Sequence, residues 1–425
     1  MRLSSVAVTA DSVFMRLTSG LSVSRPSTAR FFRLALLVPL GLPVAVAQRV
    51  LKRWLLVRIC RVRSDRLGHF IGESDLRISR ELTTDSQNFS RNEHVLHFFD
   101  SVPINTVMAD SLRKRFRFGP KFLLEGAYWI NRALGANSPW LTDWPTIPGM
   151  PDLSVLNRDT QWFRFTPNQK IAGRRILSEL GIGLGDRYVC LFPRDAAYGT
   201  QVASEVLERS QKYRNCALET FDPAVKRMQE LGLKVVLMGR SVTDRSDVKI
   251  DGVIDYRSSD QVGDLADLML AANCDFALAC DTGSAFLPIL FRKRLAIVNT
   301  LSPWGLFQGT AVSVCTMKTW RRSDGSSLSL KELLFEGQSF GPMGPDSDFF
   351  DSLGLTCVDC SPEEILDVVE EMLSLKVSAH ETVFEDLRGD LVSNQAANLL
   401  ALRKPGNWQV PFSPSWLSRR PHFLA

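Results

Sequence analysis

The stretch "DFALACDTGSAFLPILFRKRLAIVNT", from Asp275 to Thr300, has the pattern of a strand, a turn, a helix and a second strand. Both strand segments are almost continuously apolar, which is typical of parallel strands buried on both faces. The turn between the first strand and the helix is Asp-Thr-Gly-Ser, Asp281 to Ser284. This stretch therefore predicts an α/β fold, with the turn at the carboxyl end of a buried strand.

The same alternation of apolar strand segments and amphipathic helix segments continues on both sides of this stretch. Upstream lie the strand segments "YVCLFPR", "KVVLMGR" and "GVIDY" and the helix segments "FDPAVKRMQELGL" and "VGDLADLMLAANC". Capping boxes predict a helix after Thr166 and another in "SPEEILDVVEEML". Further upstream, "WLLVRICRV" and "HVLHFF" predict strands, with a polar loop, "RSDRLGHF", after the first. The pattern predicts parallel sheets covered by helices on both faces.

Basic residues are concentrated near the N-terminus. Residues 1–80 hold 14 Lys/Arg against 4 Asp/Glu, although the whole chain has a net charge of only +5. They surround an apolar stretch, Phe31 to Ala47, which is short for a spanning helix of about 20 residues. Three interpretations stay open: a segment lying on an anionic membrane surface, which we favour, a single inside-positive anchor, and a cleaved signal peptide.

The eight cysteines lie mostly in apolar segments, as Cys190, Cys280 and Cys315 do. This placement is typical of buried thiols in a reducing compartment and not of a disulfide framework. Only Cys357 and Cys360 have the spacing of a metal or redox pair, and no second pair lies near them in the sequence. We expect no metal site and no nucleic-acid partner.

The turn at Asp281 also matches the active-site tripeptide of pepsin-like aspartic proteases. Those enzymes need two carboxylates that share a proton, and the chain has no second Asp-Thr-Gly or Asp-Ser-Gly. After a parallel strand, the turn instead lies where α/β folds bind ligands. Gly283 would let a ligand approach, and the Thr282 and Ser284 hydroxyls with the first N–H groups of the next helix would suit a phosphate. A plain helix cap is an equally simple interpretation.

Other predicted strand ends carry polar residues of the same kind. The candidates are Arg194, Asp195, Tyr198, Arg214, Gly239 and Arg240. An arginine at a strand end can hold a phosphate, and a neighbouring carboxylate can orient the arginine or act as a base. A surface ion pair is the simpler alternative for Arg194 and Asp195. Because several strand ends share this chemistry, the sequence predicts one ligand site at the carboxyl edge of the sheet.

Taken together, these segments resemble heptosyltransferase-like glycosyltransferases of the GT-B fold and a group of bacterial glycosyltransferases found with surface-polysaccharide genes. The resemblance rests on "RLGHF", "PRDAAY", "FDPAVKRMQELGLKVVLMGR", "VIDY" and "DTGSAFLPILF". It covers about residues 54–375 and is strongest over residues 188–300. It implies two Rossmann-like parallel-sheet domains that face a cleft, with a nucleotide-sugar in the C-terminal one and no bound metal or cofactor.

The expected domain boundaries follow from this resemblance and from the composition. We expect a basic and apolar N-terminal extension over residues 1–53, an acceptor-side Rossmann-like domain with a Pro-rich linker over 54–165, a nucleotide-sugar-binding Rossmann-like domain over 166–375, and a C-terminal helix and tail over 376–425. The tryptophans of the linker indicate that it packs against the protein.

By position, the resemblance also implies roles for individual residues. Asp281 to Ser284 would line the donor diphosphate, and Arg194, with Arg240 as a second candidate, would offset its charge. Heptosyltransferases often have a histidine after this turn, whereas Ala285-Phe286-Leu287 stands here, so the donor sugar stays open.

The base that takes the acceptor proton is expected among Asp65, His69 and Asp195, although a structural loop histidine is as good an account of His69. The expected reaction moves a sugar from a nucleotide diphosphate-sugar to a lipid- or polysaccharide-linked acceptor. We expect it in the cytoplasm, peripherally on the inner membrane. Alternatives are a nucleotide-sugar epimerase of the same fold and a catalytically silent protein that assists assembly at the membrane.

Overall fold

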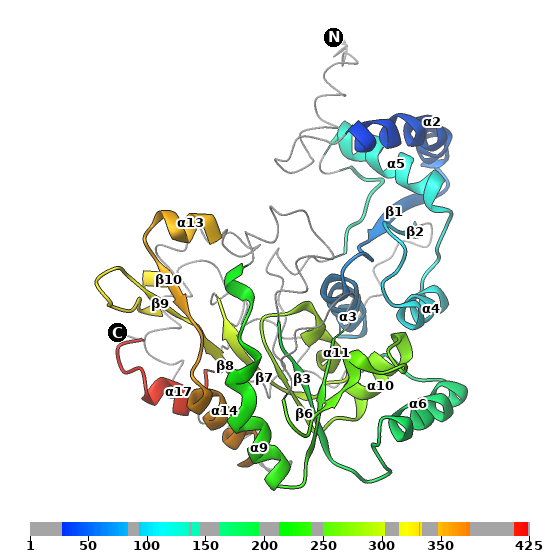
Figure 1. Ribbon diagram of the computed structural model, residues 1–425. Helices are drawn as coiled ribbons and strands as arrows, with labels where there is room; N and C mark the ends of the chain where they lie inside the picture. The colour runs from blue at the N-terminus through cyan, green and yellow to red at the C-terminus, as the bar shows by residue number, and fades with distance from the viewer. Residues whose placement is uncertain are drawn as a thin grey trace. The chain divides into compact units, whose positions relative to one another are not determined.

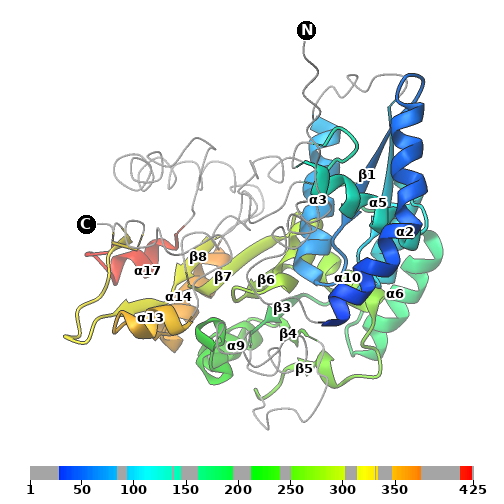
Figure 2. The same cartoon turned by 90° about the horizontal axis from the view of Figure 1, so that it is seen from above.

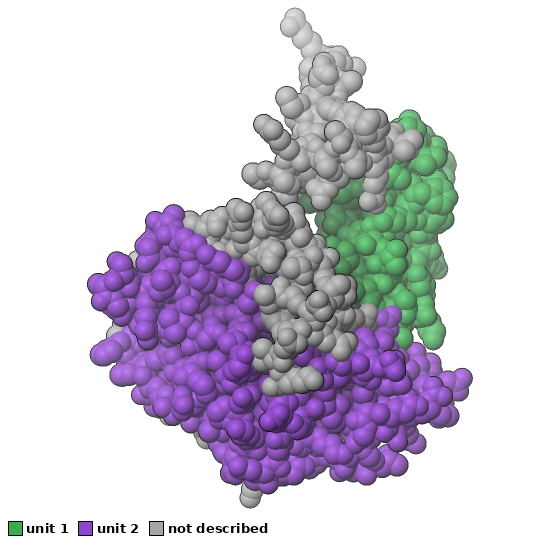
Figure 3. All heavy atoms as spheres, viewed as in Figure 1, with its two compact units in different colours: residues 1–77, 84–145 green, residues 78–83, 146–425 purple. Residues whose placement is uncertain are grey.

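The chain divides into two compact units, which Figure 3 shows in different colours. Unit 1 holds residues 1–77 and 84–145, and unit 2 holds residues 78–83 and 146–425. The computed structural model describes residues 28–83, 93–135, 138–144, 161–194, 212–239, 250–301, 314–330, 332–333, 347–374 and 412–423.

Unit 1 contains a parallel pair of strands, β1 (Leu56–Val62) and β2 (Glu93–Phe99), in register over their whole length. Its helices are α2 (Thr28–Leu51), the first part of α3 (Leu67–Thr83), α4 (Thr106–Arg115) and α5 (Lys121–Leu134). Both predicted strands are therefore confirmed. In the described part of the linker Trp140 and Trp144 are buried, which confirms that this part packs against the protein.

The polar loop predicted in "RSDRLGHF" is wrong in its second half, because helix α3 begins at Leu67. Phe70 and Ile71 on this helix are fully buried, as are Leu76 and Ile78. These residues lie on several sides of the helix, and most positions from Gly68 to Ser79 are buried, so the segment forms a buried helix directly after β1. His69 therefore lies in the first turn of a helix.

Helix α2 packs along α5, as Figures 1 and 2 both show. Their backbones touch at two glycines: a Cβ atom at Gly41 would lie 2.1 Å from the Ala127 nitrogen, and one at Gly126 would lie 2.0 Å from the Leu37 oxygen. Only residues without a side chain allow so close an approach. One side of the N-terminal apolar stretch, with Ala45 and Val44, thus packs into the core of unit 1, whereas Leu42 and Val46 are about half-exposed.

Unit 2 contains a six-stranded parallel sheet in the order β5-β4-β3-β6-β7-β8. The strands are β3 (Tyr188–Phe192), β4 (Lys234–Leu237), β5 (Ile254–Asp255), β6 (Phe276–Ala279), β7 (Arg294–Thr300) and β8 (Val314–Met317). Numbered along the unit, this is the 3-2-1-4-5-6 order of dinucleotide-binding sheets. The predicted α/β class with parallel strands is confirmed.

The helices of unit 2 connect and cover these strands (Figure 1). They include α6 (Pro167–Glu179), α9 (Asp222–Glu230), α10 (Asp264–Asn273), α11 (Phe286–Leu290), α13 (Ser347–Ser352), α14 (Pro362–Ser374) and α17 (Pro414–Ser418). Both capping boxes are confirmed, at Thr166 with Gln169 and at Ser361 with Glu364. Because crossovers between parallel strands are right-handed, α9 falls on one face of the sheet and α11 on the other.

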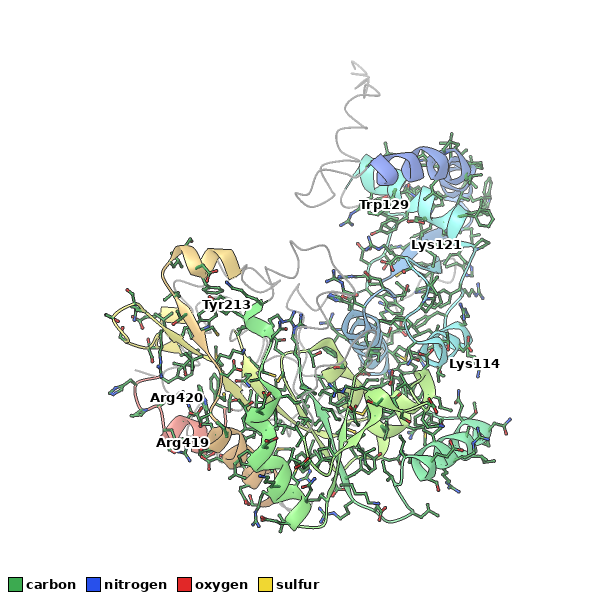
Figure 4. The ribbon with its side chains drawn as sticks, in the orientation of Figure 1. Lys114, Lys121, Trp129, Tyr213, Arg419 and Arg420 are labelled. Atoms are coloured by element: carbon green, nitrogen blue, oxygen red, sulfur yellow. The ribbon has the colours of Figure 1, made fainter. Side chains whose placement is uncertain are left out.

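The C-terminal segment, residues 412–423, packs against α14. Arg420, labelled in Figure 4 beside α17, donates from Nη2 to Glu364 Oε2 at 2.9 Å and stacks over Trp416 with its guanidinium carbon 4.6 Å from the ring centre. Two further strands, β9 (Thr319–Arg321) and β10 (Thr356–Val358), follow β8 in the sequence and form a short antiparallel pair.

Candidate functional site

The predicted ligand residues lie where the strand order of unit 2 reverses. β3 and β6 pair side by side, but the chain leaves β3 toward β4 on one side and leaves β6 toward β7 on the other. In open α/β sheets, ligands bind in the crevice at the carboxyl ends of two such strands. Arg194 follows β3 and Asp281 follows β6. The topology therefore selects this edge as the candidate site.

The turn after β6 is tightly folded. The Thr282 nitrogen donates to the Cys280 oxygen at 2.7 Å, and the Thr282 and Ser284 hydroxyls lie 3.1 Å apart. Gly283 and Ser284 are the first two residues of a 3-10 helix, η6 (Gly283–Ala285), so their N–H groups have no acceptor inside it. Two hydroxyls and two N–H groups are therefore gathered in one turn, which is chemistry suited to an anion.

The helical segment predicted after this turn, "GSAFLPILF", begins as the 3-10 helix η6, so its α-helical part is short. Helix α11 covers only Phe286–Leu290, and Arg292, with φ of +54°, turns the chain away toward β7. A helix of little more than one turn has few aligned peptide dipoles and so contributes little field at its N-terminus. Most of the positive charge for an anion must come from side chains.

Arg214 supplies such a charge. It ends a 3-10 helix, η3 (Lys212–Arg214), and its Nη2 donates to the Asp281 main-chain oxygen at 2.7 Å and to Asp281 Oδ1 at 3.0 Å. The side chains are 21% and 12% exposed, so the pair is largely shielded from solvent. Asp281 is thus engaged in orienting Arg214, which agrees with a positioning role and not with a protease aspartate.

Cys216 links this arginine segment to both strand ends. Its nitrogen donates to the Arg194 oxygen at 2.9 Å, and its Sγ lies 3.2 Å from Cys280 Sγ. This thiol contact lowers the pKa of Cys216 below its ordinary value, whereas the same contact and burial raise the pKa of Cys280 well above it. The segments after β3, η3 and β6 are therefore held together in one site.

Lys318, which the sequence did not single out, supports the same segment. It follows β8, and its side chain is 2% exposed. Its Nζ donates to the Asn215 oxygen at 2.5 Å and to Asp359 Oδ1 at 2.6 Å. A lysine directly after the apolar strand "VCTM" is the signal that could have found it.

At the end of β4 the predicted Gly239 has a φ of +140°, and a Cβ atom there would lie 3.5 Å from Arg257 Cδ. Arg257 donates from Nε to Asp255 Oδ1 at 3.0 Å and from Nη2 to Oδ2 at 3.1 Å. Burial acts to raise the pKa of Asp255, but Arg257 overcomes it and lowers the pKa below its ordinary value. The predicted Asp195, Tyr198 and Arg240 lie outside the described residues.

Unit 1 holds the two remaining candidates. Asp65 is half-exposed, with Arg66 Nε 3.9 Å from its Oδ2. His69 Nδ1 lies 3.0 Å from Glu73 Oε1, and the buried Glu73 also accepts from Arg63 Nη1 at 3.2 Å. With Nδ1 bonded to a carboxylate, Nε2 is the nitrogen that can take a proton. Glu73 was not expected as a site residue, although its spacing of four residues from His69 places both on one face of a helix.

Cys357 and Cys360, the two cysteines with the spacing of a metal or redox pair, are free thiols. Cys360 is fully buried, and its Sγ lies 3.2 Å from Thr316 Oγ1. Burial raises the pKa of the Cys357 thiol to about 12 and also raises that of Cys360. Across the described ranges, no group of three His, Cys, Asp or Glu side chains could hold a metal ion.

Comparison with models of protein families finds no match for this chain, and comparison with curated proteins finds none either. Solved structures that are similar to it include a glycosyl transferase of family 9 from Veillonella parvula, with a TM-score of 0.41 and 12% identity, over 75% of this chain and 97% of that one. The ADP-heptose lps heptosyltransferase II of E. coli has a TM-score of 0.38 and 12% identity, over 74% and 98%.

A third similar structure is the dodecameric iron-containing heptosyltransferase TibC in complex with ADP-D-beta-D-heptose. Its TM-score is 0.33 and its identity 11%, over 75% of this chain and 77% of that one. All three TM-scores are below 0.5, and the proposals that follow rest on the geometry of this chain alone.

Proposed function

We propose that the chain is a glycosyltransferase whose unit 2 binds a nucleotide diphosphate-sugar. The observation that carries this proposal is the pairing of Arg214 with Asp281 at the point where the strand order reverses, next to the hydroxyls of Thr282 and Ser284. A sheet with this strand order and an anion site at this edge is suited to a nucleotide joined to phosphates.

In this proposal, side chains stabilise the charge that develops on the leaving diphosphate. Arg214 is fixed by Asp281, and Arg194 lies at the neighbouring strand end, largely buried. Guanidinium groups held in a shielded place interact with phosphate oxygens more strongly than they would in water. Two arginines would therefore favour departure of the diphosphate without a bound metal or cofactor.

We assign the acceptor proton to His69, with Asp65 as the alternative. As the acceptor oxygen bonds to the anomeric carbon and the bond from that carbon to the diphosphate oxygen breaks, His69 Nε2 would take the proton of the acceptor hydroxyl. Glu73 would orient the ring and stabilise its charged form through Nδ1. The acceptor class we propose is a hydroxyl of a lipid-linked or polysaccharide-linked glycan.

The N-terminal helix adds a membrane component to this proposal. Leu42, Val46 and Val50 recur every four residues on α2 and are 51%, 49% and 63% exposed. Residues 28–55 contain no Asp or Glu, and several basic residues follow this stripe. An exposed apolar stripe beside basic residues favours an anionic membrane surface. None of the helices in the described part of the chain is both long and apolar enough to span a membrane.

Two measurements test the proposal. Calorimetry with UDP-, GDP-, ADP- and CMP-linked sugars should reveal binding of one nucleotide class, and absence of binding to all of them would favour a silent assembly protein. Release of free nucleoside diphosphate should then require an acceptor extract. A change in the sugar of the bound donor without any nucleotide release would instead identify an epimerase.

A further inference from the structure

Unit 2 has a pocket at the opposite end of the sheet from the candidate site. Its volume is about 550 Å³, and it is lined by the segment before α6, by α6 and α10, and by the loop that leads into β3. Tyr188, which lines it, begins β3, whereas Arg194 follows the end of that strand. Six residues of extended chain at about 3.3 Å each separate the two sites by about 20 Å.

One wall of this pocket is aromatic. The ring centroids of Phe163 and Phe165 are 5.2 Å apart, and the Phe291 ring lies 5.7 Å from the first and 5.6 Å from the second. Met269 of α10 and Leu177 of α6 extend the apolar lining. Phe163 and Phe291 are buried and Phe165 is half-buried, so a ligand body placed here would bury apolar surface chiefly against Phe165, which the other two rings hold in position.

Cations surround the apolar wall. Arg164, Lys170 and Arg174 line the pocket, and the last two share one face of α6 because they are four residues apart. Within the part of the chain that the structure describes, none of their three side chains makes a hydrogen bond or an ion pair with another residue. Three exposed cationic side chains that line one pocket, with no counter-charge on them among the described residues, favour an anionic ligand.

The one acidic residue among the described lining residues does not supply that counter-charge. Asp186 accepts hydrogen bonds from Lys234 Nζ at 2.6 Å and from the Gly183 nitrogen at 2.7 Å. These bonds lower the pKa of the Asp186 carboxyl below its ordinary value. Its charge is already balanced by a lysine outside the pocket, so the excess of positive charge inside remains.

We propose that this pocket binds a phosphate monoester with an aromatic or aliphatic body. The phosphate lies among Arg164, Lys170 and Arg174, and the body packs against the three phenylalanines. A pocket of this size that combines an apolar wall with a few convergent polar groups is typical of small-molecule sites. The site is separate from the proposed nucleotide site, and neither proposal depends on the other.

The first test uses phenyl phosphate and inorganic phosphate as probes with the full chain. Calorimetry should show that phenyl phosphate binds more tightly than inorganic phosphate. Arg174→Gln should weaken phenyl phosphate binding by about 10-fold or more, because it removes a charge-assisted contact. Arg175→Gln is the matched control: Arg175 is the next residue on α6, lies 3.5 Å from Glu179 and does not line the pocket.

A second variant tests the apolar wall. Ala272 of α10 lines the pocket, and Ala272→Trp should fill the space of the ligand body while leaving all three cations in place. Phenyl phosphate should then lose its advantage over inorganic phosphate. An unchanged advantage in this variant, with an unchanged melting temperature, would contradict the proposed position of the body.

The phosphate ester could be a free molecule or the headgroup of a membrane lipid, and vesicles distinguish the two. Sedimentation with phosphatidic acid vesicles should be compared between Arg174→Gln and Arg175→Gln, since α2 is the same in both. If Arg174→Gln loses phenyl phosphate binding but sediments with the vesicles as Arg175→Gln does, the ligand is a free ester. Loss of both phenyl phosphate binding and vesicle binding in Arg174→Gln identifies a lipid headgroup, whereas loss of vesicle binding with phenyl phosphate binding intact would contradict the proposed position of the phosphate. If the two variants behave alike in both assays, the pocket does not bind phosphate esters.

Discussion

Arg214 and Asp281 form a largely buried ion pair beside the carboxyl end of β6, with Arg214 Nη2 3.0 Å from Asp281 Oδ1. A second arginine-aspartate pair lies at the amino ends of β3 and β6, where Arg187 Nε is 2.6 Å from Asp275 Oδ2. In that pair the arginine is 61% exposed. The same two strands therefore carry a shielded pair at the candidate site and a solvated pair at their other end.

These two pairs give a matched test of the donor site. Arg214→Gln should lower the affinity for the nucleotide diphosphate-sugar by about 10- to 100-fold, because it removes a charge-assisted bond to phosphate. Arg187→Gln should leave the affinity unchanged, since it removes only a surface ion pair. Calorimetry measures the donor affinity of both variants. An equal loss of affinity in the two would show that Arg214 does not contact the donor.

His69 should act on catalysis and not on donor binding. His69→Ala should reduce kcat by about 100-fold or more, the range for loss of a general base, with donor affinity unchanged. Glu73→Gln should reduce kcat less, because the amide oxygen can still accept from His69 Nδ1 and orient the ring. Retention of full kcat in His69→Ala would leave Asp65 and Asp195 as the candidates for the base.

Stability should fall at acid pH through His97, which is buried in unit 1. Burial lowers its pKa from 6.5 to about 4, and its ring lies near Phe116, Phe118 and Trp144. His97 binds a proton more tightly in the unfolded chain than in the folded protein, so its protonation favours unfolding. The contribution of neutral His97 to stability is therefore complete above pH 6.5 and is lost as the pH falls toward 4. The loss should reach about 3 kcal/mol in the free energy of unfolding.

Denaturant unfolding at several pH values measures this loss. His97→Asn keeps a hydrogen-bond donor near the Arg117 oxygen, which lies 3.3 Å from His97 Nδ1, but does not titrate in this range. The variant should lose the steep dependence between pH 6.5 and 4. His94→Asn is the control on the same strand, and if it flattened the profile equally, His97 would not be the group responsible.

Close contact between α2 and α5 should be sensitive to a single methyl group. Gly126→Ala would place a Cβ atom 2.0 Å from the Leu37 oxygen, so the two helices must separate. We expect the free energy of unfolding to fall by about 2 kcal/mol or more. Gly135→Ala, just after α5, is the control, because a Cβ atom there meets nothing within 4 Å. Equal unfolding midpoints for Gly126→Ala and Gly135→Ala would contradict the close contact between α2 and α5.

Membrane attachment should depend on the exposed stripe of α2. Val46→Glu adds a negative charge to that stripe and should move the protein from the pellet to the supernatant in sedimentation with anionic vesicles. The unfolding midpoint should stay the same, because Val46 points to solvent. A variant that still sediments with vesicles would show that α2 is not the attachment surface.

Much of the fold could be predicted from local patterns. The strands before Arg194 and Asp281 were expected from their apolar runs, and the helix after Thr166 from its capping box. The 3-10 turn η6 before α11 was not predicted from the sequence, although such turns are frequent at the N-termini of α-helices. The helical start at Leu67 was hidden by the polar residues around it.

The candidate site was only partly predictable. The sequence predicts both Arg214 and Asp281 as ligand residues, but it predicts no contact between them. Nothing in a spacing of 67 positions indicates that one donates to the other. Glu73 and Lys318 were missed because a buried charge looks the same in a sequence as an exposed one. Their importance depends on the partners that the fold brings to them.

By itself, the sequence determined the α/β class, the parallel character of the sheets and the chemistry available at each strand end. These properties follow from periodicity and from capping residues, which act over a few neighbours. The tertiary structure decided the strand order, and with it the place where the chain reverses direction between β3 and β6. Strand order depends on contacts between distant segments, so only the folded chain determines that Arg214 meets Asp281.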